Sequence, residues 1–575
     1  MPRPDAPAWI VLGHADGGAV AALLDAGGAE TGRRALTSSE LPGWVAEREA
    51  ADAPRWVWND APQWYGPLLR AGVRVGRCHD LRLCHAILRS SSLVVRGAMR
   101  GPGGWDAAPF VAVADSAPAL FDLERAERPA GPPDALDEAL AEFARQRDAV
   151  ASSADPSRLR LLLAAESAGA LIAEELRAAG LPWDAAAHDG ILIDLLGERP
   201  AGGGQPAKLA AAAARVRDAL GDPAASLDSQ PKLLRSLHRA GVLVESTSRW
   251  ELAEHQHPVI APLLEYKKLA RLLSANGWAW LDEWVADGRF RPVFVPGGVV
   301  TGRWASSGGG ALQLPRQLRE AVRADPGWKL VVADVAQLEP RVLAAMSSDA
   351  ALAAAARGRD LYAGIVESGA VPSRQQAKIA LLGAMYGATT GESGRLMPRL
   401  RRAYPRAMGL VDDAARTGED GGVVSTWLGR SSPSPSEAWA AAQSQATEAE
   451  ASGADETRAR RWARDRGRFT RNFVVQGTAA EWALAWMADL RSRLHAMPPV
   501  DADLAAPRSG PVFARRPHLA FFLHDEVIVH APASLADGVA QAVTDAAAAA
   551  GRLLFGDFPV DFRLDVNIAD SALKG

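Results

Sequence analysis

Two acidic side chains that follow short apolar runs constrain the fold of this chain most. Residues 330–333 predict a buried strand, and Asp334 ends it next to a helix start. Residues 518–530 predict a hairpin, because two apolar runs flank a tight turn that holds Asp525 and Glu526. Taken alone, each aspartate could equally be a turn or capping residue. Together, two aspartates on strand ends of one sheet can hold a pair of Mg²⁺ ions for an in-line phosphoryl displacement.

Residues 372–387 predict a helix that carries a cationic stripe. Ser373 and Gln376 have the spacing of a capping box, which places the helix start near residue 374. Positions four apart form a stripe along one face, about 18 Å long and long enough for a nucleoside triphosphate. Its members are Arg374, Lys378, Leu382 and Tyr386. Arginine and lysine both bind phosphate, although an amphipathic helix with two solvated cations would have the same pattern.

A third segment, residues 458–476, begins with a run of arginines and ends with two amide side chains. Five arginines fall between residues 458 and 466, and Arg468 follows them. Such a stretch is usually a solvated helix face, but it could also neutralise phosphates irrespective of base sequence. Asn472 and Gln476 lie four apart on one helical face, and their amides can bond base edges or sugar oxygens.

Composition narrows the class of protein. The 575 residues have the length of about four domains, and no apolar run is long enough to predict a membrane span. The two cysteines, Cys78 and Cys84, exclude a disulfide framework and a four-cysteine zinc site, which favours a reducing cytoplasm. The net charge of −4 does not indicate a nucleic-acid binder. Only seven of the 64 basic residues are lysines, so a lysine inside a motif is notable.

Patterning along the chain predicts a small α/β region, a helical region and a second α/β region from about residue 291. Apolar runs predict strands at residues 8–12, 55–58, 93–95 and 110–113. Periodicity and Pro/Gly content predict a linker at 127–135, helices at 158–179 and 259–278, and a loop at 202–205. A Ser/Pro/Ala/Glu-rich insert at 431–457 is expected to be mobile.

These segments resemble the motifs of family A DNA polymerases, the bacterial polymerase I type. Residues 334–344 resemble motif A, residues 374–387 motif B and residues 524–527 motif C. Three further segments agree with the family: TGR…LQ…P at 301–315, N-x-x-x-QGTAA at 472–480, and the thumb–palm helix at 265–269. Their order and approximate spacing are the family's across residues 155–575.

The resemblance implies an α/β multidomain protein. An RNase H-like domain of the 3′–5′ exonuclease type would precede a right-hand polymerase with an antiparallel palm sheet, helical fingers and a helical thumb. The expected segments are 1–135 for the exonuclease-like domain, 136–290 for the thumb and the start of the palm, 291–348 for the palm with motif A, 349–471 for the fingers with motif B, and 472–575 for the palm with motif C.

The resemblance also implies roles for individual catalytic and dNTP-binding residues. Asp334 and Asp525 would bind two Mg²⁺ ions, with Glu526 and His524 supporting them beside the primer end. Arg374 and Lys378 would hold the β- and γ-phosphates, and Lys378 would act as a general acid toward pyrophosphate. Glu339 would exclude a 2′-hydroxyl. The other dNTP-binding residues would be Gln337, Leu382, Tyr386 and His524.

The implied DNA contacts involve side chains from two segments. Arg303 and Gln476 would touch the minor groove of the primer–template. The full expected set is Arg303, Gln313, Asn472, Gln476 and Arg468.

Four positions depart from the family pattern. Leu381 and Leu382 replace an asparagine and an aromatic residue in motif B, so the nucleotide loses a stacking partner. Val335 replaces the tyrosine after the motif A aspartate, and Pro340 replaces a leucine or similar residue. We interpret the chain as a divergent polymerase, slower or of lower fidelity than its relatives.

The N-terminal region lacks the carboxylates that a 3′–5′ exonuclease needs. Residues 13–16 follow the first predicted strand without the D-x-E pattern, and Gln63 stands where an N-x-x-x-D pattern from Asn59 requires aspartate. Asp80 resembles a third fragment of the site. We expect a domain that keeps the fold without proofreading, and no 5′ nuclease domain.

The sequence therefore predicts a template-directed DNA polymerase of repair or replication. It would act as a monomer in the cytoplasm, associated with the nucleoid, on primer–template DNA and dNTPs. One alternative is a catalytically weak primer–template-binding protein, which Leu381 and Leu382 favour. The other is a single-subunit RNA polymerase. Glu339 and the pair Asp525–Glu526 favour DNA synthesis over this alternative.

Overall fold

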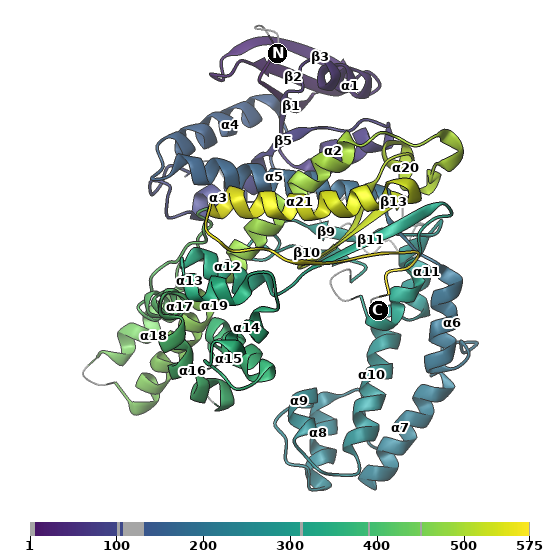
Figure 1. Cartoon of the computed structure of the whole chain (residues 1–575), viewed down its shortest axis with the longest axis vertical. Coiled ribbons are helices and arrows are strands. Elements are labelled where there is room, and N and C mark those ends of the chain that lie inside the picture. Colours follow the sequence, from purple (N-terminus) through teal and green to yellow (C-terminus); the bar gives the residue numbers. More distant parts are fainter. Residues whose placement is uncertain are drawn as a thin grey trace. The chain divides into compact units, whose positions relative to one another are not determined.

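The computed structural model describes residues 6–15, 17–99, 104–106, 131–310, 314–388, 391–448 and 451–573. The chain divides into two compact units (Figure 1). The first unit comprises Met1–Gly180, Val293–Ser307 and Pro326–Ala569, and the second comprises Leu181–Pro292, Gly308–Asp325 and Asp570–Gly575.

A five-stranded sheet begins the first unit, in the order β3-β2-β1-β4-β5. Strand β1 pairs antiparallel with β2 and parallel with β4, and β4 pairs parallel with β5. Buried tryptophans and aliphatic side chains fill its core, which explains why short apolar runs became strands here. The elements are β1 (Trp9–Ala15), β2 (Gly18–Leu24), β3 (Glu30–Thr37), α1 (Leu41–Ala51), β4 (Arg55–Trp58), α2 (Ala61–Arg70), β5 (Arg77–Asp80), α3 (Leu81–Ser90) and α4 (Leu136–Ala151).

The predicted strands at 8–12 and 55–58 correspond to β1 and β4. The predicted strand at 93–95 is wrong, because these residues form a turn that packs Leu93 against a small apolar cluster after α3. An apolar run can be buried without a strand partner. The predicted strand at 110–113 and residues 127–130 of the predicted linker lie outside the described residues.

Two long helices link the sheets of the first unit. Helix α5 (Pro156–Ala179) begins at Asp155, whose side chain accepts from the Arg158 amide, and most of its residues are buried. Helix α19 (Gly453–Ala496) has 44 residues and begins with a capping box formed by Ser452 and Asp455. Buried Glu175 of α5 accepts from Arg491 of α19 at 2.7 Å. Removal of either partner would leave an uncompensated buried charge, so this pair contributes to holding the two helices together.

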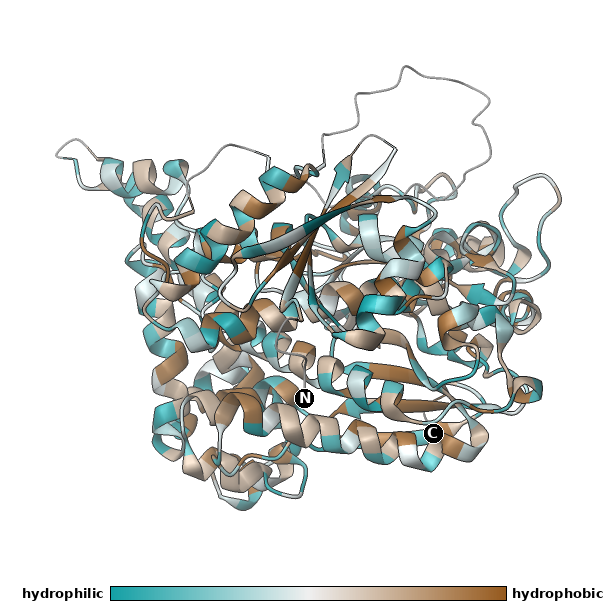
Figure 2. Ribbon diagram, turned by 90° about the horizontal axis from the view of Figure 1, so that it is seen from above, coloured by the Kyte–Doolittle hydropathy of each residue, from teal (hydrophilic) through white to brown (hydrophobic). Residues whose placement is uncertain are grey.

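The first unit also contains a four-stranded antiparallel sheet, in the order β12-β13-β11-β14. Its strands are β11 (Trp328–Val335), β12 (His518–Leu523), β13 (Glu526–Pro532) and β14 (Leu564–Ala569), and helix α21 (Ala536–Phe555) packs along three of them (Figure 1). The predicted hairpin at 518–530 corresponds to β12 and β13. Hydrophobic stretches run along several strands, whereas the helices mix both kinds of residue (Figure 2).

The remaining elements of the first unit are mostly helices. They are β9 (Val293–Val295), β10 (Ala305–Gly308, which crosses into the second unit), α12 (Leu338–Met346), α13 (Ala350–Ala356), α14 (Leu361–Glu367), α15 (Arg374–Tyr386), α16 (Gly391–Ala403), α17 (Pro405–Glu419), α18 (Glu437–Ala446) and α20 (Gly510–Phe513).

Helix α18 lies inside the segment 431–457 that we expected to be a mobile insert. Ser436 caps it, alanine favours its helical backbone, and Gln443 donates to the Ala459 carbonyl of α19 at 3.0 Å. A Ser/Pro/Ala/Glu-rich composition therefore did not exclude an ordered, docked helix here.

The second unit is mainly helical. Its elements are β6 (Leu181–Pro182), α6 (Ala185–Leu196), α7 (Ala207–Leu220), α8 (Gln230–Arg239), α9 (Arg249–Ala253), α10 (Ile260–Asn276), α11 (Trp278–Trp284), β7 (Val285–Ala286), β8 (Arg289–Phe290) and a 3₁₀ helix (Arg316–Ala321). Helix α10 matches the predicted helix at 259–278, and residues 202–205 form no regular element. Trp183, Trp280 and Phe290 pack together in the aromatic core.

The two units do not coincide with the segments expected from the sequence. Helices α4 and α5 belong to the same unit as the N-terminal sheet, although residues 136–290 were assigned to one segment. The division into exonuclease-like domain, palm, fingers and thumb stays a prediction. In the described part of the chain, no helix is long and apolar enough to cross a membrane.

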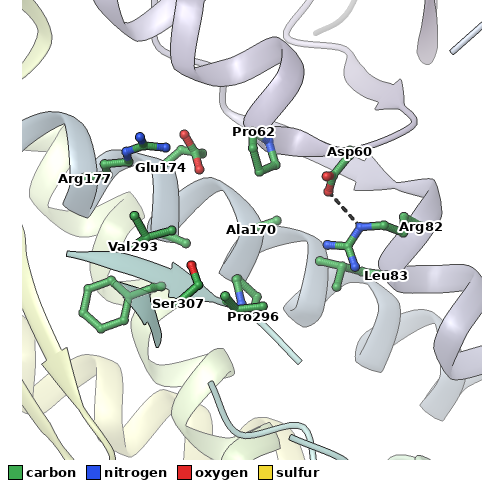
Figure 3. Close-up of a pocket in the computed structure, with 13 residues that line it drawn as sticks. Asp60, Pro62, Arg82, Leu83, Ala170, Glu174, Arg177, Val293, Pro296 and Ser307 are labelled. Atoms are coloured by element: carbon green, nitrogen blue, oxygen red, sulfur yellow. Dashed lines mark hydrogen bonds and ion pairs between the residues drawn. The ribbon is translucent and has the colours of Figure 1, made fainter. Parts of the chain in front are cut away.

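A small pocket in the first unit lies beside α5. Glu174 and Arg177 line one side, and Asp60 and Arg82, which form an ion pair at 3.0 Å, line the other (Figure 3). Glu174 is only 9% exposed. Burial raises its pKa from 4.5 to about 7, against the opposing effect of Arg177.

This pKa shift predicts a pH-dependent stability. Because the folded state holds the Glu174 proton more tightly than the unfolded state, unfolding becomes easier as the pH rises from about 4.5 to about 7. Glu174→Gln abolishes this pH dependence. The difference in unfolding free energy between the variant and wild type should therefore rise by about 1–3 kcal/mol from pH 4.5 to pH 8, in favour of the variant. Urea titrations at both pH values measure this gain.

Glu138→Gln, at an exposed position of α4, is the matched control and should show no such gain. An equal difference between Glu174→Gln and wild type at both pH values would contradict the prediction.

Candidate active site

The register of the four-stranded sheet brings the predicted metal-binding aspartates together. Asp334 of β11 lies directly opposite Glu526 of β13, and the Val335 amide donates to the Asp525 carbonyl at 2.9 Å. Asp334 and Asp525 therefore occupy neighbouring positions at one end of the sheet. This backbone arrangement is the one that the sequence predicted.

A further carboxylate, which the sequence reasoning missed, lies on the other side of Asp334. Asp565 of β14 is its direct partner in the register. Residues directly opposite each other in an antiparallel pair project to the same face, so Asp334, Glu526 and Asp565 share one face. The alternation Leu564-Asp565-Val566 was the available signal, because it is typical of a strand with one polar face.

The donor chemistry of this edge fits magnesium, which prefers carboxylate oxygens. Among the residues that the structure describes, no group of three or more His, Cys, Asp or Glu side chains forms a site for a metal ion. Mg²⁺ commonly uses one or two carboxylates and takes its other ligands from water and substrate phosphates. Asp334 and Asp525 could hold it in that manner.

Two predicted residues from distant segments, Arg303 and Tyr386, meet at Glu339. Arg303 and Tyr386 both donate hydrogen bonds to the Glu339 carboxylate. Burial and the Glu339 charge raise the pKa of Tyr386 above its ordinary value. His524 lies in the hairpin turn with a φ of +56°. Burial lowers the pKa of His524, and the nearby charge of Arg303 lowers it further.

Helix α15 presents the predicted stripe. Arg374, Lys378 and Tyr386 are exposed and Leu382 is half-buried, whereas Leu381 is fully buried in the apolar core. The expected capping box is only half formed. Ser373 accepts from the Gln376 amide at 3.3 Å, but the Gln376 side chain donates to Glu392 instead of returning to Ser373.

Arg374 is linked to motif A through a residue that the sequence reasoning missed. Asp360 accepts from Arg374 at 2.7 Å and from Gln337 at 3.0 Å. Gln337 precedes α12 in a left-handed conformation, three residues after Asp334. Hydrogen bonds therefore connect Arg374 to the segment that follows Asp334. Asp360 had no motif to mark it beyond a position suited to a helix N-cap.

The predicted DNA-contacting side chains lie mainly along α19. Asn472 and Gln476 are half-buried on this helix. Their helix packs against the segment that carries Arg303, because a Cβ at Gly477 would lie 3.0 Å from the Thr301 carbonyl. Gln313 lies outside the described residues.

Arg468 packs against the end of α15. Gly387 ends that helix with a φ of +75°, and a Cβ there would lie 2.7 Å from Cγ of Arg468. Only glycine meets both requirements without strain. Arg468 also pairs with Asp465 on its own helix.

Comparison with known proteins decides the family. Residues 237–572, more than half of the chain, match the model of DNA polymerase family A. The chain belongs to this family. DNA polymerase I of Chloroflexus aurantiacus is 28% identical over 369 residues, covering 59% of this chain and 35% of the relative. The thermostable DNA polymerase I of Thermus thermophilus is 26% identical over 361 residues, covering 57% and 38% respectively.

The chain thus spans about a third of the length of these family A relatives. A solved structure, the POL domain of Pol1 from M. smegmatis in complex with DNA primer–template and dNTP, matches with a TM-score of 0.63. It covers 98% of this chain and 95% of that chain at 18% identity, which shows a shared fold.

The close approach at Gly387 predicts a specific cost of substitution. Gly387→Ala should lower the free energy of unfolding by about 2–3 kcal/mol, because the methyl group adds a clash with Arg468 to the unfavourable left-handed backbone. Urea titration measures this loss.

Gly369→Ala is the matched control, since Gly369 has the same φ of +75° with nothing near its Cβ position. It should cost only about 1–2 kcal/mol. Equal costs for the two variants would show that the Arg468 contact contributes nothing.

Proposed function

We propose that this family A protein is a template-directed DNA polymerase. It adds dNMP to a primer 3′-OH by two-metal phosphoryl transfer and releases pyrophosphate, acting in DNA repair or replication. The observation that carries the proposal is the pairing of β11 with β13, which sets Asp334 beside Asp525 in a chain that matches the family along more than half its length.

The residues would divide the work of positioning and charge neutralisation, which is what phosphoryl transfer requires of a protein. Asp334 and Asp525 would hold two Mg²⁺ ions, with Glu526 beside them. When bound, the ions would activate the attacking hydroxyl and neutralise the leaving oxygen. Exposed Arg374 and Lys378 would bind the β- and γ-phosphates, and Lys378 would give a proton to the leaving pyrophosphate.

Selection of the sugar would depend on Glu339. Two donors, Arg303 and Tyr386, hold its carboxylate in place, and this supports its role as a fixed barrier to a 2′-hydroxyl. Half-buried Leu382 offers the nucleotide no aromatic face to stack on. Loss of that contact supports a slower or less selective enzyme than relatives with an aromatic residue there.

The N-terminal domain would keep an exonuclease-like fold without proofreading. The mixed sheet β3-β2-β1-β4-β5 supports the fold. At Gly13, near the end of β1, a Cβ would lie 2.3 Å from Cα of Leu136, so α4 leaves no room for a catalytic carboxylate there. Asp80 accepts from the Leu83 and Ala61 amides and Asp60 pairs with Arg82, so both carboxylates serve the fold.

A catalytically weak primer–template-binding protein is the second candidate, for which the sequence pointed to Leu381 and Leu382. Leu381 is fully buried, so its departure from the family pattern reflects packing. Leu382 remains the single substitution at the exposed stripe that supports this candidate.

Primer extension by wild type and Asp525→Asn tests the proposal. Wild type should extend a primer in the presence of Mg²⁺ with a preference for dNTPs over rNTPs. Asp525→Asn should lose at least about 10²-fold in rate, because one metal-binding carboxylate is gone.

Asp537→Asn is the control, an exposed aspartate near the start of α21. It should extend primers as wild type does. Binding of primer–template without extension by wild type would favour the weak binder, and a preference for rNTPs would favour an RNA polymerase.

The proposal for the N-terminal domain predicts no proofreading. Purified protein should not degrade a mismatched primer 3′ end in the presence of Mg²⁺ and the absence of dNTPs, as followed on gels beside a proofreading polymerase. Mg²⁺-dependent removal of the mismatched nucleotide, abolished by Asp80→Asn but not by Asp525→Asn, would refute it.

A further inference from the structure

Arg374 is anchored by a carboxylate on another helix. The Oδ2 and Oδ1 atoms of Asp360 accept from Nη2 and Nε of Arg374 at 2.7 and 3.2 Å. The two residues are 14 positions apart and belong to the ends of different helices, α14 and α15. The pair is therefore a tertiary contact, unlike the ion pairs one turn apart on the surface helices.

Asp360 is itself fixed from two other directions. Its Oδ1 caps α14 by accepting from the Ala363 amide at 2.8 Å, and its Oδ2 accepts from Gln337 at 3.0 Å. Gln337 in turn accepts from the Leu361 amide at 3.3 Å. The carboxylate is held in place without Arg374, so the longer arginine side chain is the partner that gains order from the pair.

A buried arginine of motif A holds the loop that leads to Asp360. Arg341 is fully buried, and its guanidinium donates to the carbonyls of Ala356 at 3.0 Å and Arg359 at 2.8 Å. It also pairs with Asp561 at 2.7 Å. Residues 356–360 are therefore attached to the helix that follows Asp334.

The geometry of the guanidinium decides what the contact with Asp360 can do. Asp360 occupies the Nε–Nη2 edge of Arg374, and the guanidinium lies 5.6 Å from the Tyr362 ring centroid. The other edge, Nη1–Nη2, has the fork that binds phosphate bidentately. The Arg374 side chain is 58% exposed, and within the described part of the chain no acceptor bonds to its Nη1.

We propose that Asp360 is a positioning residue for nucleotide binding, because it holds Arg374 with its free edge ready for the incoming triphosphate. The inference rests on the proposed function, in which Arg374 binds the β- and γ-phosphates. An arginine side chain loses rotamer freedom when it binds a ligand, and a carboxylate that orders it beforehand reduces that cost. If the carboxylate instead competed with phosphate, its removal would strengthen nucleotide binding.

Asp360→Asn separates these possibilities with little risk to the fold. Asparagine is as good an N-cap as aspartate, so α14 keeps its cap while Arg374 loses the charged partner. Asp413→Asn is the matched control, because Asp413 pairs with Arg416 one turn away on an exposed face of α17. Binding of the complementary dNTP to protein on a dideoxy-terminated primer–template measures the effect without turnover.

We expect Asp360→Asn to weaken dNTP binding about three- to fivefold, the range of a partly exposed ion pair. The KM for dNTP should rise by the same factor, while kcat and primer–template affinity stay at wild-type values. Asp413→Asn should match wild type throughout. In an Arg374→Ala background, Asp360→Asn should have no further effect, since the two residues act as one unit.

Tighter dNTP binding by Asp360→Asn, or an equal loss in the Arg374→Ala background, would overturn the inference. If wild type extends primers and Asp360→Asn leaves dNTP affinity unchanged, the inference fails and the proposed function stands. If wild type binds the complementary dNTP but extends no primer, the proposed function fails and the binding measurements decide the inference. If wild type binds no dNTP, both fail.

Discussion

The backbone pairing between β11 and β13 is the constraint on which the rest of the site depends. It joins segments almost two hundred residues apart, and it places Asp334 opposite Glu526 with the Asp525 carbonyl bonded to the next amide of β11. Because side chains alternate between faces along a strand, a shift of one residue would turn Asp334 to the other face. Buried apolar residues along both strands fix the register, and α21 covers three strands of the sheet.

The elements that the sequence predicted well are those whose signal is local. The hairpin at 518–530 and the helix at 374–386 follow from apolar periodicity and a Ser N-cap, and both are observed. The stripe of α15 followed from spacing alone. The departures are also informative, because α18 formed in a segment whose composition suggested an insert, once α19 supplied a surface on which it could pack.

The contacts that organise the site could not be predicted because their partners are distant in the chain. In the sequence Arg341 has the appearance of an ordinary helix cation, yet it is fully buried and holds loop carbonyls. No motif marks Asp360, and the alternation around Asp565 indicates a strand without showing that Asp334 is its partner. Glu339 is similar, since one of its donors, Arg303, lies in the loop before β10 and the other, Tyr386, at the end of α15.

The central claim is that Asp334 and Asp525 share a metal cluster. Crystals of the protein with primer–template, a non-hydrolysable dNTP and Mn²⁺, measured at the manganese absorption edge, test it most directly. We predict anomalous peaks about 2.1 Å from carboxylate oxygens of both aspartates. Peaks coordinated by only one of them, or located away from this end of the sheet, would contradict it.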